Sequence, residues 1–134
     1  MSAETKTILI VDDEESVLTY ISTLFEENGY ATVSAKDGIE AMQKVKSGRP
    51  DLITLDMSMP NKSGVKFYRE LRDNPETKNL PVVVVTAITG YGGNPEPWEK
   101  FLNTRRQFPP PDAFIAKPFD KQELLDTVKK LLGD

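Results

Sequence analysis

Near its centre the chain reads Asp51-Leu-Ile-Thr-Leu-Asp56-Met-Ser-Met-Pro60, a short apolar run followed by one acidic residue and a turn. The run at 51–55 has the composition of a buried β-strand. A buried strand has no structural need for a carboxylate at its tip, whereas ligands of open α/β sheets bind at the carboxyl ends of the strands. We therefore take Asp56 as the candidate reactive group.

Strand-like and helix-like segments alternate along the whole chain. The β-prone apolar runs are Thr7–Val11, Ala31–Ala35, 51–55, Leu80–Thr86 and Ala113–Ala116. Their alternation with helical patterns predicts a parallel sheet with right-handed crossovers and helices on both faces. Because no repeat or linker interrupts the pattern, we predict a single α/β domain over residues 1–134, with a loose start at 1–6.

Each expected helix combines a polar start with an apolar face. Asp37 with Glu40 resembles a capping box, and Asp120 with Glu123 opens the last helix in a similar way. The apolar residues at helical spacing are Val17, Ile21, Leu24, Phe25, Ile39, Met42, Val45, Val65, Tyr68, Leu71, Leu124, Val128, Leu131 and Leu132. We expect these faces to pack on the sheet.

The composition excludes several classes of function. The 134 residues include no cysteine and no histidine, which excludes disulfides, thiolate or imidazole metal ligands and Ser-His-Asp catalysis. Any metal must then be a hard cation with oxygen ligands. A net charge of −4 does not indicate the basic surface that nucleic-acid binding requires. The sequence also contains no recognisable membrane span or signal peptide. We expect a cytoplasmic protein without nucleic-acid or membrane partners.

Polar residues follow four of the expected strands. They are Asp12 and Asp13 after the first, Asp56 after the third, Thr86 after the fourth and Lys117 after the fifth. Parallel strands point the same way, so these side chains should meet at one edge. Carboxylates there would repel one another by roughly 4 kcal/mol per pair, a cost that Mg²⁺ would remove. The set predicts phosphoryl transfer with Asp56 as the nucleophile.

The same residues carry a family resemblance. The matching pieces are Ile8-Leu-Ile-Val-Asp12-Asp13-Glu14, Asp56-Met-Ser-Met59-Pro60 with Gly64, Val82–Val85 with Thr86-Ala87, and Phe114-Ile-Ala-Lys117-Pro118-Phe119. With these motifs in order at strand ends, the chain resembles a receiver domain of bacterial two-component response regulators over essentially its whole length. The resemblance implies a doubly wound, flavodoxin-like sheet with the strand order 2-1-3-4-5.

The resemblance also implies a role for each matching residue. Asp56 would be the phosphoacceptor, and Mg²⁺ would be bound by Asp13, Asp56 and the backbone carbonyl of Ser58, with Asp12 in contact through water. Thr86 would be the switch hydroxyl, Ala87 and Lys117 would contact the phosphoryl group, and Phe114 would be the switch aromatic. Lys117–Pro118 would be a cis peptide. Ser58 and Ile88 would tune the lifetime of the phosphoryl group.

The resemblance further implies that a sensor histidine kinase or a phosphotransfer protein donates the phosphoryl group, which agrees with the absence of histidine from this chain. The only chemistry of its own would be self-catalysed phosphorylation and dephosphorylation, so the protein would not be an enzyme. Its output partner is unknown, and a homodimer is compatible with the family. A stand-alone regulator, a phosphorelay shuttle and an excised domain all fit the sequence.

Each of these residues has a plainer interpretation. Asp12 and Asp13 could cap the first helix, Thr86 could be an ordinary strand-end residue, Lys117 a surface lysine and Phe114 a core residue. Two other functions share part of the pattern. A pseudo-receiver would bind partners without phosphorylation, and a Mg²⁺-dependent hydrolase would use Asp56 as an aspartyl nucleophile. Such hydrolases usually have a second acid where this chain has Ser58, and usually a cap domain.

The sequence departs from the family pattern between Thr86 and Lys117, which are 31 residues apart. Residues 89–111 are expected to form an extended loop and a modified fourth helix that begins near Pro97. Trp98 and Phe101 would share one face of that helix. This face would either pack on the sheet or offer an aromatic anchor to a partner.

Overall fold

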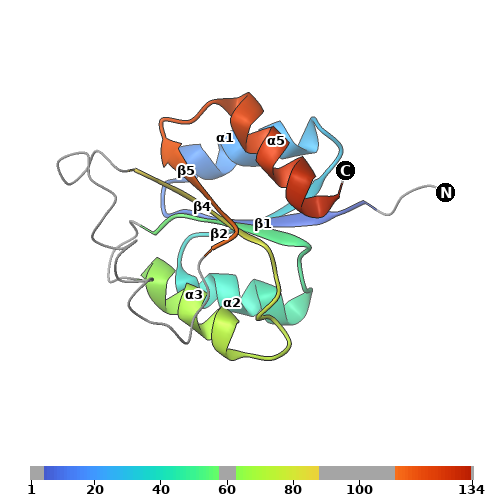
Figure 1. Ribbon diagram of the computed structural model, residues 1–134. Helices are drawn as coiled ribbons and strands as arrows, with labels where there is room; N and C mark the ends of the chain where they lie inside the picture. Colours follow the sequence, from blue (N-terminus) through green and yellow to red (C-terminus); the bar gives the residue numbers. More distant parts are fainter. Residues whose placement is uncertain (1–4, 58–62, 88–110, 134) are drawn as a thin grey trace.

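A five-stranded parallel sheet forms the centre of the protein in a computed structural model that describes residues 5–57, 63–87 and 111–133 (Figure 1). The elements are β1 (Thr7–Val11), α1 (Glu15–Glu26), β2 (Ala31–Ala35), α2 (Gly38–Ser47), β3 (Leu52–Leu55), α3 (Ser63–Asp73), β4 (Val82–Ala87), β5 (Ala113–Lys117) and α5 (Lys121–Leu132). The strand order is β2-β1-β3-β4-β5, and every neighbouring pair is parallel. The predicted fold class and strand order are confirmed.

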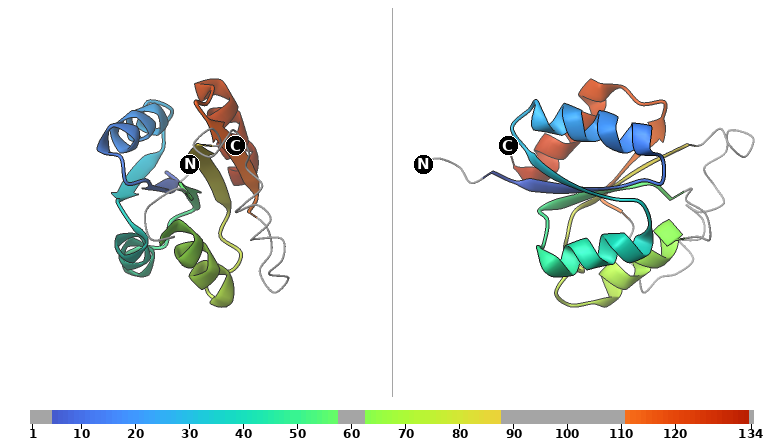
Figure 2. Two further views of the ribbon diagram at one scale, coloured as in Figure 1. Left: turned by 90° about the vertical axis from the view of Figure 1, so that its left-hand side faces the viewer. Right: turned by 180° about the vertical axis from the view of Figure 1, so that it is seen from behind.

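The helices cover both faces of the sheet. Helices α1 and α5 lie on one face and α2 and α3 on the other, as the two further views also show (Figure 2). Each face has its own apolar core, one built around Phe25 and Ile21 of α1 and one around Tyr68 and Leu71 of α3. The inner strands β1, β3 and β4 are therefore buried on both faces, which is why their sequences are apolar without alternation.

The register of β1 and β3 sets the position of the acidic residues. Val11 of β1 pairs with Leu55 of β3, so Asp12 and Asp56 leave the sheet at the same level. The Asp56 backbone N–H still donates to the Val11 carbonyl at 3.0 Å, and the Asp12 N–H donates to the Ala35 carbonyl at 3.1 Å. Both acidic residues are thus held by the sheet ladder rather than by a free loop.

Helix α2 tests the capping prediction and corrects one core assignment. The Asp37 side chain accepts from the Glu40 N–H at 2.8 Å, as predicted for an N-cap. The expectation that Ile39 faces the sheet is wrong, because Ile39 is 74% exposed. The helix buries Gly38, Ala41 and Val45 instead, and Ile39 lies about 100° further round the helix from Gly38.

A second group of charged residues lies at the other end of the sheet. The Arg72 guanidinium at the end of α3 donates from Nε to the Tyr68 hydroxyl at 3.1 Å, and from Nη1 to the carbonyls of Lys78 and Leu80 at 3.1 and 2.7 Å. Its Nη2 donates to Asp112 Oδ1 at 3.2 Å, and the same oxygen accepts from the Val82 N–H at 2.9 Å. We call Arg72, Tyr68 and Asp112 the Arg72 node; it ties α3 to the starts of β4 and β5.

Some predictions fall on residues that the structure does not describe. Ser58, Ile88, Pro97, Trp98 and Phe101 lie outside the described ranges, as does nearly all of the expected loop and helix at 89–111. Within those ranges, none of the helices combines the length and the apolar character that a membrane crossing requires.

Candidate phosphoryl-transfer site

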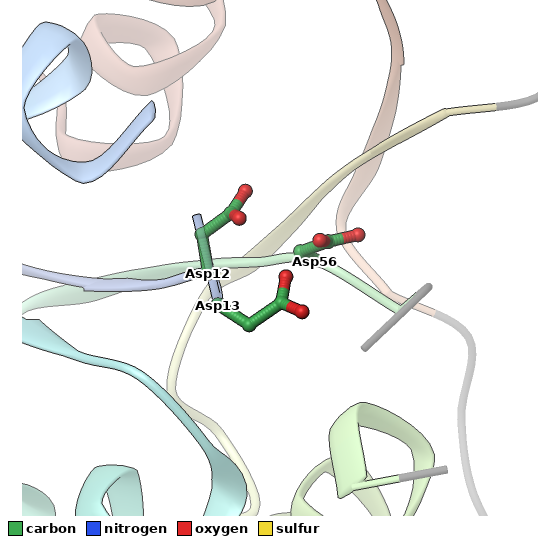
Figure 3. Close-up of side chains that lie close together, drawn as sticks. All are labelled: Asp12, Asp13 and Asp56. Carbon is green, nitrogen blue, oxygen red and sulfur yellow. The ribbon is translucent and has the colours of Figure 1, made fainter. Parts of the chain in front are cut away.

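Three carboxylates meet at the carboxyl ends of β1 and β3 (Figure 3). Each of Asp12, Asp13 and Asp56 offers an oxygen, and these oxygens all lie within 4.8 Å of one another. Asp12 and Asp56 are only 2% and 3% exposed, whereas Asp13 is open to solvent. The predicted gathering of these three residues at one edge is therefore present in the structure.

Lys117, at the end of β5, lies beside the two buried carboxylates. Its Nζ donates to Asp12 Oδ2 at 2.7 Å and lies 3.6 Å from Asp56 Oδ2. The other oxygen of Asp12 accepts from the Glu14 N–H at 2.9 Å. Three carboxylates and one ammonium leave a net charge of −2 on these four side chains, which we call the acidic edge.

Burial shifts the ionisation of this group. Burial raises the pKa of the Asp12 carboxyl above its ordinary value, although the hydrogen bond from Lys117 acts in the opposite direction. Burial acts to lower the pKa of Lys117, but its hydrogen bond to Asp12 and the nearby charge of Asp56 outweigh that effect and raise it. Lys117 is therefore a fixed positive charge at neutral pH, beside the buried carboxylates of Asp12 and Asp56.

The acidic edge fits a hard divalent cation. Its donors are carboxylate oxygens from three residues, within a spacing that one ion can span. An oxygen-only set with an exposed acid that leaves room for water suits Mg²⁺, which usually keeps several of its waters. The uncompensated negative charge supplies the reason for binding, because a cation would relieve repulsion of about 4 kcal/mol per carboxylate pair.

The remaining predicted residues are placed as follows. Thr86 and Ala87 end β4, where they pair with Ala116 and Lys117 of β5, so their backbone reaches the acidic edge. The Lys117–Pro118 peptide bond is cis. Phe114 is 41% exposed, so the interpretation of it as a core residue is wrong. It belongs to β5, which lies at the edge of the sheet.

Sequence reasoning missed the tight packing behind Asp56. Gly64 in the first turn of α3 is buried, and a Cβ atom on it would lie 2.6 Å from the Asp56 carbonyl oxygen. In the sequence, Gly64 is recognisable only as part of a motif. Its separation from Asp56 by eight positions, across a turn, carries no signal of contact without the fold.

Known proteins place the chain in a family. The family described as response regulator receiver domain has a model that matches residues 8–92. The chain belongs to this family. The polar-differentiation response regulator DivK of Brucella anthropi is 32% identical over 129 residues, covering 96% of this chain and 98% of that protein.

Two solved structures are similar to this receiver domain throughout. The chemotaxis protein CheY4 of Vibrio cholerae has a TM-score of 0.80 with 28% identity, covering 96% of this chain and 99% of that one. The receiver domain of the sensor histidine kinase PA1611 of Pseudomonas aeruginosa has a TM-score of 0.77 with 26% identity, covering 98% of this chain and 100% of that one. The latter structure holds a magnesium ion coordinated in its active-site cleft.

Membership of this family gives the protein a general role in two-component signalling. Receiver domains are generally signalling modules rather than enzymes, and they interact with histidine kinases or phosphotransfer proteins and with output domains.

Proposed function

We propose that residues 1–134 form one receiver domain that accepts a phosphoryl group on Asp56. The observation that carries the proposal is the buried Asp56 carboxylate, 3.6 Å from the Lys117 ammonium and within 4.8 Å of two further carboxylates. A carboxylate with a purely structural role is usually matched by positive charge of equal size. Asp56 instead stands in a cluster that has more negative charge than its lysine can balance, as a phosphoryl-transfer site with a cation requires.

We propose Mg²⁺ as the cofactor, bound by Asp13, Asp56 and the Ser58 backbone carbonyl, with Asp12 in contact through water. The magnesium ion in the similar PA1611 receiver domain supports this choice. Bound there, the cation would neutralise charge on the oxygens of the transferred group. Lys117 lies within reach of both buried carboxylates, and we propose that its ammonium contacts the incoming phosphoryl oxygens as well.

In the proposed reaction a partner histidine kinase or phosphotransfer protein presents a phosphohistidine. An Asp56 carboxylate oxygen attacks phosphorus, the P–N bond breaks as the P–O bond forms, and the departing imidazole takes up a proton. The new group adds about −1.5 to −2 of charge. We propose that Thr86 and Ala87 then bind its oxygens, that the exposed Phe114 rotates inward, and that the surface read by an output partner changes. Ser58 and Ile88 are proposed to tune the lifetime of the phosphoryl group.

Intact-mass spectrometry with acetyl phosphate tests the proposal. We expect an adduct of one phosphoryl group that forms only with Mg²⁺ and is lost in Asp56→Asn. Asp13→Asn, which keeps the acceptor and changes a proposed metal ligand, should shift the Mg²⁺ requirement to higher concentration. A folded protein that gains no adduct and does not consume acetyl phosphate would contradict the proposal and favour a pseudo-receiver. Rapid consumption without an adduct would favour a hydrolase.

A further inference from the structure

The packing between α3 and β3 makes Gly64 a residue of interest beyond its place in the motif. A Cβ atom on Gly64 would lie 2.6 Å from the Asp56 carbonyl oxygen, 3.1 Å from the Met57 Cα and 3.4 Å from the Asp56 carbonyl carbon. Real Cβ contacts below 3.0 Å essentially do not occur, so a side chain there would force a shift. The atoms in the way are backbone, which cannot rotate aside as a flexible side chain does.

Neither side of this contact is free to yield. Asp56 is held by its N–H bond to the Val11 carbonyl at 3.0 Å, next to a strand that is paired on both sides. Helix α3 is held by the buried Val65, Tyr68 and Leu71. At its other end, Arg72 donates hydrogen bonds to carbonyls outside the helix. A methyl group at position 64 must therefore displace the Asp56–Met57 backbone or tilt the helix away from it.

Backbone conformation does not explain the glycine. The positive-φ glycines of the described chain are Gly29 and Gly133, and Gly64 has helical geometry that alanine adopts readily. Intrinsic helix propensity favours alanine over glycine. The glycine is explained by space alone, because its missing side chain lets the first turn of α3 lie against Asp56.

We propose that Gly64 is a positioning residue for the phosphoryl-transfer site. Because Gly64 has no side chain, the first turn of α3 can lie against the backbone of Asp56 and Met57. This contact sets the position of the Asp56 carboxylate relative to the other side chains of the acidic edge. The role rests on the proposed function of Asp56. It predicts that one added methyl group, which brings neither charge nor a polar atom, impairs cation binding and phosphorylation.

Gly48 provides a matched control within the same chain. A Cβ atom there would meet nothing within 4 Å, and its φ of −170° is extended backbone that alanine adopts without strain. Gly48→Ala and Gly64→Ala make the same chemical change and restrict the unfolded chain alike. A difference between the two variants therefore reports the contact with Asp56.

The test compares wild type, Gly48→Ala and Gly64→Ala by three measurements. Amide chemical shifts of the metal-free proteins should move at Asp56 and Met57 in Gly64→Ala only. Calorimetric titration should give a Mg²⁺ dissociation constant at least about fivefold weaker in Gly64→Ala, and the rate of adduct formation with acetyl phosphate should fall by about tenfold or more. Gly48→Ala should match wild type in all three.

Three outcomes would overturn the role of Gly64. One is a Gly64→Ala protein with wild-type Mg²⁺ affinity and phosphorylation rate; another is an equal loss in Gly48→Ala. If Gly64→Ala unfolds in buffer, it is measured beside wild type in trimethylamine oxide, which favours the folded state; failure to fold there too would show a general packing role and overturn the proposal. Failure of wild type to be phosphorylated would refute the proposed function instead, while the metal-free chemical shifts would still test the contact.

Discussion

The acidic edge and the Arg72 node are both partly buried groups of charge, but they differ in how closely positive charge matches negative charge. In the node, one arginine donates to a hydroxyl, two backbone carbonyls and one carboxylate, so four of its five N–H groups have a partner and its charge is matched. At the acidic edge, one lysine faces three carboxylates. The two groups lie at opposite ends of the sheet, because Asp112 of the node precedes β5 and Lys117 of the acidic edge ends it.

The contrast indicates how to separate structural from functional charge. A buried ion whose hydrogen bonds are all made holds elements together and leaves nothing for a ligand to complete. A buried cluster with surplus charge costs folding free energy unless something else binds there. The stability that the Arg72 node contributes should therefore not depend on Mg²⁺, whereas the stability of the acidic edge should. Substitutions in each group can test this difference.

Among these substitutions, the largest loss of stability is expected from Arg72→Met. The substitution keeps much of the apolar stem but leaves the Lys78 and Leu80 carbonyls without their donor and Asp112 without its cation. We expect the free energy of unfolding to fall by about 3 kcal/mol, at the lower end for breaking a buried pair because the Asp112 side chain is 39% exposed. Urea denaturation measures the change, and Mg²⁺ should stabilise this variant no more than wild type.

Asp112→Asn is the control for charge within the node. The amide oxygen can still accept from Arg72 and from the Val82 N–H, so only the ion pair is removed. We expect a loss below about 1 kcal/mol, since the pair is partly exposed. A loss equal to that of Arg72→Met would mean that the charge pair, rather than the hydrogen bonds to carbonyls, holds the node together.

A Mg²⁺-dependent loss of stability, smaller than that of Arg72→Met, is expected from Lys117→Met. Without the ammonium, no lysine charge offsets the repulsion between the buried carboxylates of Asp12 and Asp56. We expect a loss of about 2 kcal/mol in the absence of divalent cations. Because Mg²⁺ would supply the missing positive charge, the difference from wild type should shrink markedly when it is added.

The measurement for Lys117→Met is a pair of urea titrations, one with Mg²⁺ and one with a chelator. Arg72→Met serves as the matched control, because it also removes one buried cation but at the balanced group. Equal stabilisation of both variants by Mg²⁺ would remove the distinction between the two regions.

The acidic edge was predictable from sequence and the Arg72 node was not, for a physical reason. Asp12, Asp13, Asp56 and Lys117 each follow a recognisable strand, and parallel strands bring their carboxyl ends together whatever the intervening residues are. Arg72 ends a helix, where a cation is ordinary. Its burial depends on the path of residues 74–80 and on Asp112, forty positions away, and neither follows from local pattern.

The errors at Ile39 and Phe114 have a similar origin. Apolar spacing identifies a helical face but not its rotation, and α2 is turned so that Ala41 and Val45 face the core while Ile39 does not. Alternation along β5 places Ile115 inward and the neighbouring Phe114 outward. The sequence predicts the elements well because their periodicity is local, but which side of an edge element is covered depends on the rest of the fold.

A further effect on stability, smaller than those of Arg72→Met and Lys117→Met, is expected from Tyr68→Phe and depends on pH. At neutral pH the variant should lose about 1 kcal/mol, because the Arg72 Nε–H loses the hydroxyl that accepts its hydrogen bond. Burial raises the pKa of Tyr68 above its ordinary value of 10.0, although Arg72 acts in the opposite direction. The folded protein thus holds the phenol proton more tightly than the unfolded chain does.

The sign of the pH effect follows from that difference in proton binding. The contribution of the Tyr68 proton to the free energy of unfolding is fully present below pH 10.0. It is lost as the pH rises through the raised pKa that Tyr68 has in the folded state. Phenylalanine has no proton to lose, so the stability difference between wild type and Tyr68→Phe should narrow above pH 10.0 in urea denaturation. If the stability difference between wild type and Tyr68→Phe stays constant or widens above pH 10.0, loss of the Tyr68 proton does not destabilise the folded state. The node would then owe its stability to the guanidinium and the carbonyls alone.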